Sequence, residues 1–334
     1  MMSYKQIRLR FALLLLLLVL TVAVSLSVGY ANSSFKDVFA VFGGSKSRLM
    51  LLIISQIRLP RIIACILGGA SLALAGVLLQ TLTKNPLADS GILGINTGAG
   101  LAVAFAVGLT DFSNPAAVSM TPIFAMLGGG TTIMAVYFIS RKKNHGVSPN
   151  RLIVTGVGVS SMLSGAMVTI ISKLDDYKMS YIVEWLSGKV TGGNWTMLTL
   201  FAPILILLWV ITYSRSYALN IMNLNEQTAL ALGLQLQRER LYTLILSTAL
   251  AAFSVILVGN ITFVGLVAGH ITRRIFGGDH RLVLPASMFV GIFILLTADT
   301  IGRVLLVGTG IPTGIVVSVI GAPYFLYLMV TKPS

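Results

Sequence analysis

The sequence predicts an all-α polytopic membrane protein with about ten transmembrane helices. Of its 334 residues, 56% are hydrophobic and only 10% are charged, whereas roughly a quarter of the residues in a soluble domain are charged. Apolar stretches recur along the whole chain, separated by polar or Gly/Pro-rich joints. A chain of this kind cannot cover its surface for water and needs lipid as its solvent. We therefore expect residues 1–334 to form a single transmembrane domain.

Ten apolar stretches approach the roughly 17 to 25 residues that a transmembrane helix needs. The first follows a basic segment, as in a signal peptide, but its length and the nine stretches after it favour a retained helix. The eighth is short and Gly-rich, which predicts a tilted or broken helix. The predicted spans are Phe11–Val28, Ile62–Leu82, Ile92–Leu109, Thr121–Ser140, Leu152–Ile171, Trp195–Tyr213, Leu241–Val258, Phe263–Ile275, Leu282–Ala298 and Pro312–Val330.

The formal net charge of +14 divides unevenly between the two sides of the membrane. With residues 1–10 in the cytoplasm, ten spans return the C-terminus there, and most of the 24 Lys and Arg residues fall on that side. This bias agrees with the positive-inside rule. The excess of basic residues is therefore explained without a nucleic-acid partner. We expect a multi-pass protein of the cytoplasmic membrane. The basic residues on the outer side are Lys36, Lys46, Arg48, Arg58, Arg61, Lys173, Lys178, Lys189 and Arg303.

Patterns typical of enzymes and metal sites are missing from the sequence. There is no phosphate-binding loop of the form GxxxxGK[ST], so we do not expect this chain to hydrolyse ATP. His145, His270 and His280 do not cluster with carboxylates at metal-ligand spacing, and the single Cys65 allows no intrachain disulfide. We expect a transporter subunit without a cofactor or a metal site, and a membrane enzyme is the weaker alternative.

Ionisable residues inside the predicted spans are scarce, which argues against an ion-coupled secondary transporter, the second alternative. His270 lies in the short eighth span, where we interpret it as a polar group satisfied by backbone or water. Asp299 lies at the outer end of the ninth span, and Arg303 follows it at helical i,i+4 spacing. This spacing predicts an ion pair at the helix end.

Several segments carry a more specific signal. From Gln56 the chain reads QIRLPR, GASLALAGVLLQ and KNPLADSGILGINTGAG, followed later by NLNEQTALALGL, FVGLVAGHITRR, DHRLVLP, ADTIGR and IPTGIVVSVIGAPYFLYL. In these segments the chain resembles the permease subunits of the iron-siderophore and cobalamin ABC importers. The resemblance implies the type II ABC importer permease fold with ten helices, in agreement with the independent count. One departure is Gly269, because the family usually has proline before the histidine at this point.

The resemblance also implies a function and a set of partners. The chain is expected to be the permease for an Fe(III)-siderophore, with cobalamin and haem as alternatives. It would form a dimer with a second permease chain, identical or paralogous, and the fifth and tenth spans would line the path between them. Further expected partners are an ABC ATPase dimer that hydrolyses ATP, an extracytoplasmic siderophore-binding protein, and membrane lipid.

Arg58, Arg61 and Arg303 lie on the outer side, against the overall charge bias. By resemblance, they form the docking site for glutamates on the two lobes of the binding protein. The chemistry is suitable, since a guanidinium group can bind a carboxylate through two parallel hydrogen bonds. The alternative is that these side chains extend to lipid phosphates.

The joint between the second and third spans contains Asn85, Pro86 and Leu87. By resemblance, Asn85 and Leu87 belong to a cytoplasmic gate below the substrate, and Ser160 and Ser161 of the fifth span contribute to it. The alternative for Asn85 is an ordinary Asn-Pro turn.

Residues 214–240 form the longest cytoplasmic loop and are amphipathic between Leu219 and Arg240. The pattern Glu226-x-x-Ala229-x-x-x-Gly233 resembles the coupling helices that fit into a groove of the ATPase subunit. By that resemblance, Ala229 allows close helix approach and Gly233 provides a backbone break. A solvated connector helix is the alternative.

Overall fold

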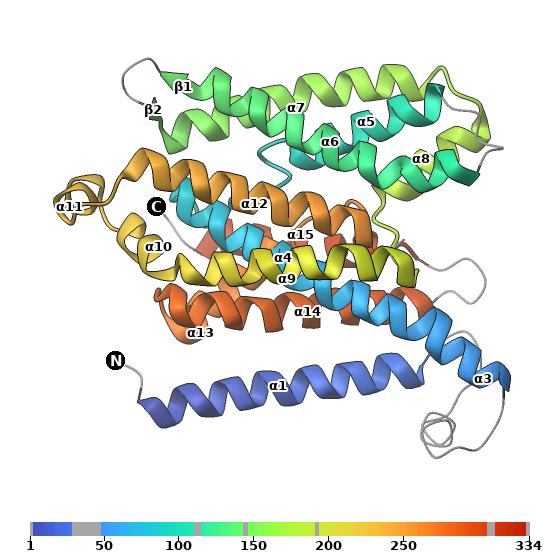
Figure 1. Ribbon diagram of the computed structural model, residues 1–334, viewed down its shortest axis with the longest axis horizontal. Helices are drawn as coiled ribbons and strands as arrows, with labels where there is room; N and C mark the ends of the chain where they lie inside the picture. The colour runs from blue at the N-terminus through green and yellow to red at the C-terminus, as the bar shows by residue number, and fades with distance from the viewer. Residues whose placement is uncertain are drawn as a thin grey trace.

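A computed structural model describes residues 3–28, 48–109, 115–142, 146–190, 194–305 and 311–331. Most of its long helices lie along one direction and form a single bundle (Figure 1). Lys36, Lys46 and His145 from the sequence analysis lie outside the described residues. The elements in chain order are α1 (Tyr4–Ser27), α3 (Arg48–Leu52), the π-helical segment η1 (Ile53–Arg58), α4 (Leu59–Thr83), α5 (Ile95–Leu109), α6 (Pro115–Ser140), β1 (Arg141–Lys142), β2 (Gly146–Val147), α7 (Pro149–Ile171), α8 (Asp176–Leu186), α9 (Trp195–Ser214), α10 (Ser216–Asn223), α11 (Glu226–Ala231), α12 (Leu236–Val258), α13 (Val264–Phe276), α14 (His280–Leu305) and α15 (Thr313–Thr331).

Every predicted span overlaps one of these helices. Eight helices of the described chain are long and apolar enough to cross a membrane, and the shorter α5 and α13 account for the other two predicted spans. With 13 residues, α13 is short, as the Gly-rich eighth stretch predicted. The helix α5 begins at Ile95 instead of Ile92, because the chain first passes through a turn that ends at Gly94 with φ +82°. That backbone conformation favours glycine.

Short polar side chains mark where several helices begin. Before α1, the Ser3 hydroxyl accepts a hydrogen bond from the Gln6 backbone N–H, and the Gln6 side chain accepts one from the Ser3 N–H. Asp175 accepts from the Lys178 N–H before α8. These contacts satisfy N–H groups that have no partner inside a helix.

The central element is α4, which is buried along nearly its whole length and contacts α9, α12, α13 and α14. It lies in the middle of the bundle (Figure 1). A Cβ added at Gly76 would lie 2.4 Å from the Gly265 Cα of α13, and one added at Gly69 would lie 2.7 Å from the Gly291 carbonyl oxygen of α14. Only glycine permits such backbone approach. In lipid, burial of apolar side chains gives little driving force, so close packing of this kind holds the helices together.

The helices α1 and α7 lie at opposite edges of the bundle (Figure 1). On α1, the Phe11 ring packs 4.7 Å from the Phe276 ring at the end of α13, but most of its leucines are exposed. On α7, Val154, Met162 and Val168 are exposed. Apolar surface of this extent needs lipid or another protein to cover it.

One end of the bundle carries the start of α1, the β1–β2 hairpin, α10 and α11, and the other end carries α3 and α8 (Figure 1). The two strands pair antiparallel, with Arg141 opposite Val147. The helices α10 and α11 project from the bundle beyond the end of α9 and the start of α12 (Figure 1). The predicted coupling segment and the predicted docking arginines therefore lie at opposite ends.

Candidate docking, gating and coupling sites

Two of the predicted docking arginines bind one buried carboxylate. Asp299 of α14 is 0% exposed. Its Oδ1 accepts a hydrogen bond from Arg61 Nε at 2.8 Å and one from Thr313 Oγ1 at 3.1 Å, and its Oδ2 accepts one from Arg303 Nε at 3.0 Å. The predicted i,i+4 ion pair of Asp299 with Arg303 is thus confirmed. The second partner of Asp299 is Arg61 at the start of α4. The sequence did not predict this contact.

The end of α1 binds the other parts of this arginine group. Arg58 Nη1 donates to the Leu26 carbonyl oxygen at 2.6 Å, and Arg303 Nη2 donates to Ser25 Oγ at 2.8 Å. Arg58 is only 4% exposed, whereas the side chains of Arg61 and Arg303 are 28% and 15% exposed. In this conformation Arg61 has the most exposed side chain of the three.

The predicted gate residues Asn85 and Leu87 lie in a turn directly after α4. Asn85 Oδ1 accepts a hydrogen bond from the Leu87 N–H at 2.9 Å, which is the geometry of an Asx turn. The side chain of Leu87 packs with Leu266 and Val267 of α13 and Leu328 of α15. The Asn-Pro turn is therefore present, and it places Leu87 against the hydrophobic cluster that α13 and α15 form.

The two serines predicted for the gate differ in environment. Ser160 Oγ is buried and has no hydrogen-bond partner within the described residues. It lies beside the start of α5, because a Cβ added at Gly94 would be 2.8 Å from it. Ser161 is exposed and donates to the Val157 carbonyl oxygen of its own helix at 3.0 Å. No hydrogen bond joins either serine to Asn85 or Leu87 in the described part of the chain.

The predicted coupling segment is divided into the two short helices α10 and α11. Asn225 caps α11 by accepting a hydrogen bond from the Thr228 N–H at 2.7 Å. Gly233 follows α11 with φ +81°, which agrees with the predicted backbone break. Ala229 is fully buried within its own chain, whereas Leu230 and Leu232 of the same segment are exposed.

Glu226, the first residue of α11, forms an ion pair with Arg240 of α12. Arg240 is buried, and its Nη1 donates to the Val147 carbonyl oxygen of β2 at 3.1 Å. The backbone N–H of Val147 in turn donates to Gln237 Oε1 at 3.0 Å. The coupling segment, the start of α12 and the hairpin between α6 and α7 thus form one connected polar group.

Asn220 of α10 connects the coupling segment to the corner between α13 and α14. Its Nδ2 donates to Asp279 Oδ1 at 2.8 Å, and its Oδ1 accepts from the His280 backbone N–H at 2.8 Å. His280 Nε2 lies 2.8 Å from Thr81 Oγ1 near the end of α4. Hydrogen bonds from Arg281 hold the pKa of Asp279 well below its ordinary value. The segment DHRLVLP was the only sequence signal for this network, and it indicated no partner.

A second buried carboxylate, Asp89, was also missed. It follows the gate turn, and its Oδ2 accepts a hydrogen bond from the Phe263 N–H at 3.1 Å, just before α13. Phe263 has φ +67° and lies against Gly321 of α15, where an added Cβ would be 2.6 Å from the Phe263 Cβ. Asp89 therefore joins the loop after α4 to the start of α13 and, through Phe263, to α15.

Comparison with known proteins identifies the family of this chain. Residues 16–331 match the FecCD transport family. The chain belongs to this family. The iron(3+)-hydroxamate import system permease protein FhuG of Bacillus subtilis is 38% identical over 293 residues, covering 86% of this chain and 87% of that protein. The Fe(3+)-citrate import system permease protein YfmE of the same organism is 40% identical over 277 residues, covering 83% of this chain and 81% of that protein.

A solved structure supports the same assignment. A metal-chelate type ABC transporter in an inward-facing conformation superposes with a TM-score of 0.81 at 31% sequence identity, and covers 96% of this chain and 98% of that one. The predicted all-helical permease fold is therefore confirmed. This FecCD-family chain is a multi-pass membrane permease subunit, not an enzyme. ABC importer permeases work with ATPase and binding-protein partners.

Proposed function

We propose that this FecCD-family permease carries an Fe(III)-siderophore across the cytoplasmic membrane, powered by separate ATPase subunits. The observation that carries the proposal is the similarity over more than four fifths of their length to two permeases named for ferric hydroxamate and ferric citrate import. Cobalamin and haem are the alternative cargoes. All three cargoes need a wide path through the membrane. The permease contributes to transport by fitting the cargo differently in its inward-open and outward-open states.

The proposed orientation places both termini in the cytoplasm. Its support is the excess of basic residues on that side and the position of α10 and α11 at the same end of the bundle as the start of α1 (Figure 1). In this arrangement the whole chain is one transmembrane domain, residues 1–10 are cytoplasmic, and residues 214–240 are the cytoplasmic coupling segment.

The binding protein is proposed to dock at Arg58, Arg61 and Arg303. Asp299 pairs with both Arg61 and Arg303. One carboxylate against these two guanidinium groups leaves positive charge, which attracts carboxylates and fixes the register of docking. Arg61 is the primary contact in the conformation described, because it is the most exposed of the three. Arg58 contributes by holding the end of α1 in place.

The ATPase is proposed to bind the coupling segment through Glu226, Gly233 and the exposed leucines around them, with Ala229 allowing close helix approach from its buried position within the segment. Movement of this segment reaches the proposed gate by two routes. Lys84 Nζ donates to the Leu224 carbonyl oxygen at 2.6 Å, directly before Asn85 and Leu87. The second route runs from Asn220 through the α13–α14 corner to α4. A chain of hydrogen bonds of this kind can carry coupling between distant sites if movement of the ATPase shifts it to a second arrangement.

A second permease chain is proposed to pack against α7 and α15, with the substrate path between the two chains. Both helices expose apolar side chains, among them Val154, Met162 and Val319. A Cβ added at Gly158 or Gly165 of α7 would meet no atom within 4 Å. These open small-residue positions permit the backbone of a neighbouring helix to approach closely.

The decisive experiment reconstitutes the permease with its ATPase and binding protein in vesicles and measures ATP-dependent uptake. The panel contains radiolabelled iron as a ferric hydroxamate, ferric citrate and a ferric catecholate, together with haem and cobalamin. We expect uptake of one of the iron chelates and of neither haem nor cobalamin. Uptake of cobalamin alone would reject the iron assignment. Uptake that persists without ATP and stops with a protonophore would identify an ion-coupled carrier.

A further inference from the structure

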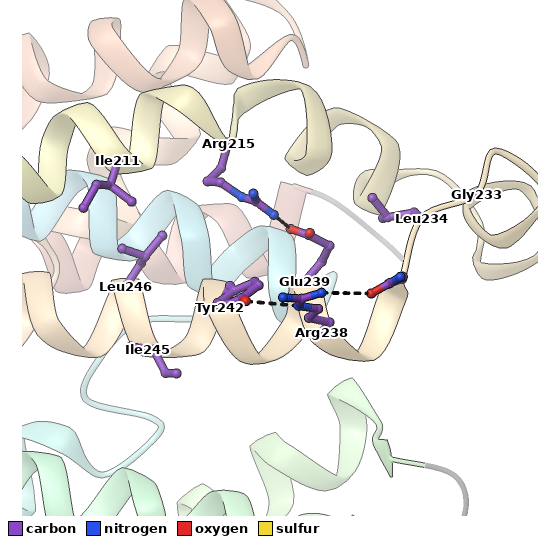
Figure 2. A pocket seen from close by; sticks show the side chains of 10 residues that line it. Ile211, Arg215, Gly233, Leu234, Arg238, Glu239, Tyr242, Ile245 and Leu246 are labelled. Atoms are coloured by element: carbon purple, nitrogen blue, oxygen red, sulfur yellow. Dashed lines mark hydrogen bonds and ion pairs between the residues drawn. The ribbon is translucent and has the colours of Figure 1, made fainter.

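A cavity of about 650 Å³ lies between the end of α9 and the start of α12. Its polar wall is formed by the side chains of Arg215, Arg238, Glu239 and Tyr242, and its apolar wall by residues such as Ile245 (Figure 2). This wall lies where α9 ends and α12 begins, and both helices are long and apolar enough to cross a membrane. Arg215, Arg238 and Glu239 lie within residues 214–240 but take no part in the hydrogen bonds and ion pairs described above for docking, gating and coupling.

The charges of the cavity do not cancel. Arg215 forms an ion pair with Glu239, but its Nε is buried and has no hydrogen-bond partner in the described part of the chain. Arg238 has no carboxylate partner in the part of the chain that the structure describes: its Nε donates to the Tyr242 hydroxyl at 3.0 Å and its Nη1 to Gln235 Oε1 at 3.4 Å (Figure 2). Both guanidinium groups lie 5.5 Å from the centre of the Tyr242 ring. Two cations and one carboxylate leave the cavity with an excess positive charge.

An apolar groove of about 560 Å³ begins beside this cavity and runs between α6 and α12. Ile245 lines both hollows, so they adjoin at this residue of α12. The groove is lined by Met134 and Phe138 of α6, both exposed, and by Leu241 and Phe253 at its two ends on α12. Nothing in its lining carries a formal charge.

The length of the groove fits one leaflet of a membrane. From Leu241 to Phe253 the helix rises about 18 Å at about 1.5 Å per residue, and one leaflet contributes half of a hydrocarbon core of about 30 Å. Arg238 lies one turn of helix before Leu241, towards the end of α12 that faces the coupling segment. A molecule with an anionic head and a long apolar chain therefore matches the cavity and the groove together.

We propose that the cavity and the groove form a binding site for an anionic phospholipid. The phosphate binds Arg215 and Arg238, and one acyl chain lies in the groove between α6 and α12. Basic pockets between transmembrane helices bind anionic lipid headgroups by this chemistry, and guanidinium groups match phosphate oxygens in pairs. The proposal rests on the proposed function only for the side of the membrane, which makes this the cytoplasmic leaflet.

A bound lipid at this place would act on the coupling segment. Gly233 and Leu234, the residues through which the chain leaves α11 for α12, also line the cavity. A headgroup that contacts Arg215 and Arg238 fills the space beside Gly233 and Leu234. The lipid therefore restrains the connection between the ATPase-binding segment and α12.

The test of the headgroup uses the full-length chain in nanodiscs of phosphatidylcholine and phosphatidylglycerol, with native mass spectrometry of the lipids retained after transfer to detergent. The variant is Arg238→Gln, and the matched control is Arg151→Gln, an exposed arginine at the start of α7. We expect retained phosphatidylglycerol to exceed phosphatidylcholine, and Arg238→Gln to lower this ratio about fivefold, the effect of roughly 1 kcal/mol per interfacial basic residue. No preference in the wild type, or an equal loss in the control, would overturn the proposal.

The test of the groove uses Gly130→Leu, which fills it from α6. A Cβ added at Gly130 meets no atom within 4 Å, so the variant can fold without a clash. The control is Thr131→Leu, the exposed neighbour that does not line the groove. We expect Gly130→Leu to reduce retention of phosphatidylglycerol and Thr131→Leu to leave it unchanged.

Two further outcomes would overturn the proposal. If millimolar inorganic phosphate displaces phosphatidylglycerol completely, the ligand is a phosphate ion and the groove has no part in binding. If phosphatidylglycerol is retained by the permease alone but not by its complex with the ATPase, the cavity belongs to the ATPase interface. A failure of iron uptake leaves the lipid measurements unaffected, so the two proposals are tested separately.

Discussion

The Lys84 ammonium group and the Leu224 carbonyl oxygen are 2.6 Å apart, which joins the end of α4 to the coupling segment. Lys84 ends α4 in the left-handed region, with φ 51°. The next residues of the chain are those of the proposed gate. One hydrogen bond thus connects the segment proposed to bind the ATPase with the turn proposed to close the path.

Replacing Lys84 with methionine tests this connection, because methionine keeps an unbranched side chain and loses the donor. We expect Lys84→Met to lower the amount of cargo transported per ATP hydrolysed several-fold, while ATP hydrolysis by the complex continues. Both rates are measured on the same vesicles. Lys5→Met, at an exposed lysine of α1, is the control and should keep the wild-type ratio. A wild-type ratio in Lys84→Met would show that the contact does not transmit movement.

Arg61 is the best place to test docking, because it is the most exposed of the three arginines while its pair with Asp299 holds it in position. We expect Arg61→Gln to weaken binding of the partner binding protein by about tenfold, the loss of one charge-assisted hydrogen bond of roughly 1.5 kcal/mol. The dissociation constant is measured with the permease in nanodiscs. Lys173→Gln removes another exposed cation from the outer side and should leave the constant unchanged. If both variants weaken binding equally, Arg61 contributes only to the overall positive charge of the outer side and not through a specific contact.

The sequence predicted this arginine group only in part. The pair of Asp299 with Arg303 could be predicted, because a helix places residues four apart on the same face. The contact of Arg61 with Asp299 spans 238 positions, and such distant pairs depend on how α4 crosses α14. That crossing depends on the close approach at Gly69 and Gly291, which a stripe of small residues indicates without naming its partner.

The apolar spans were predictable for a different reason. A bilayer requires a minimum length of apolar helix, so composition alone locates such segments. The polar networks outside the spans have no comparable rule. Asn220, His280 and Thr81 lie on three elements, and only the folded chain brings their side chains within hydrogen-bond distance. The break at Gly233 was predictable, because glycine alone adopts a positive φ at little cost.

Asn220 is expected to be important for stability as well as for coupling. Asn220→Ala removes the acceptor of the His280 N–H and a donor to Asp279. Leaving a buried polar group without a partner costs about 1–3 kcal/mol, so we expect a lower melting temperature for the purified permease. Asn223→Ala, at an exposed position of the same helix, is the control and should melt as the wild type does. An unchanged melting temperature in Asn220→Ala would mean that water replaces the lost contacts.

Gly233 tests the proposed ATPase seat through a matched pair of glycines. Gly233 and Gly277 have φ values of +81° and +83°, and a Cβ added at either would meet no atom within 4 Å. Tryptophan therefore imposes the same backbone strain, of order 1–3 kcal/mol, and the same lack of internal clash at both positions. Only Gly233 lies in the coupling segment. We expect Gly233→Trp to abolish transport while the ATPase either dissociates or hydrolyses ATP without uptake, and Gly277→Trp to retain uptake. Co-purification and uptake measured together separate the two results, and equal losses in both variants would attribute the effect to strain instead of to a lost contact with the ATPase.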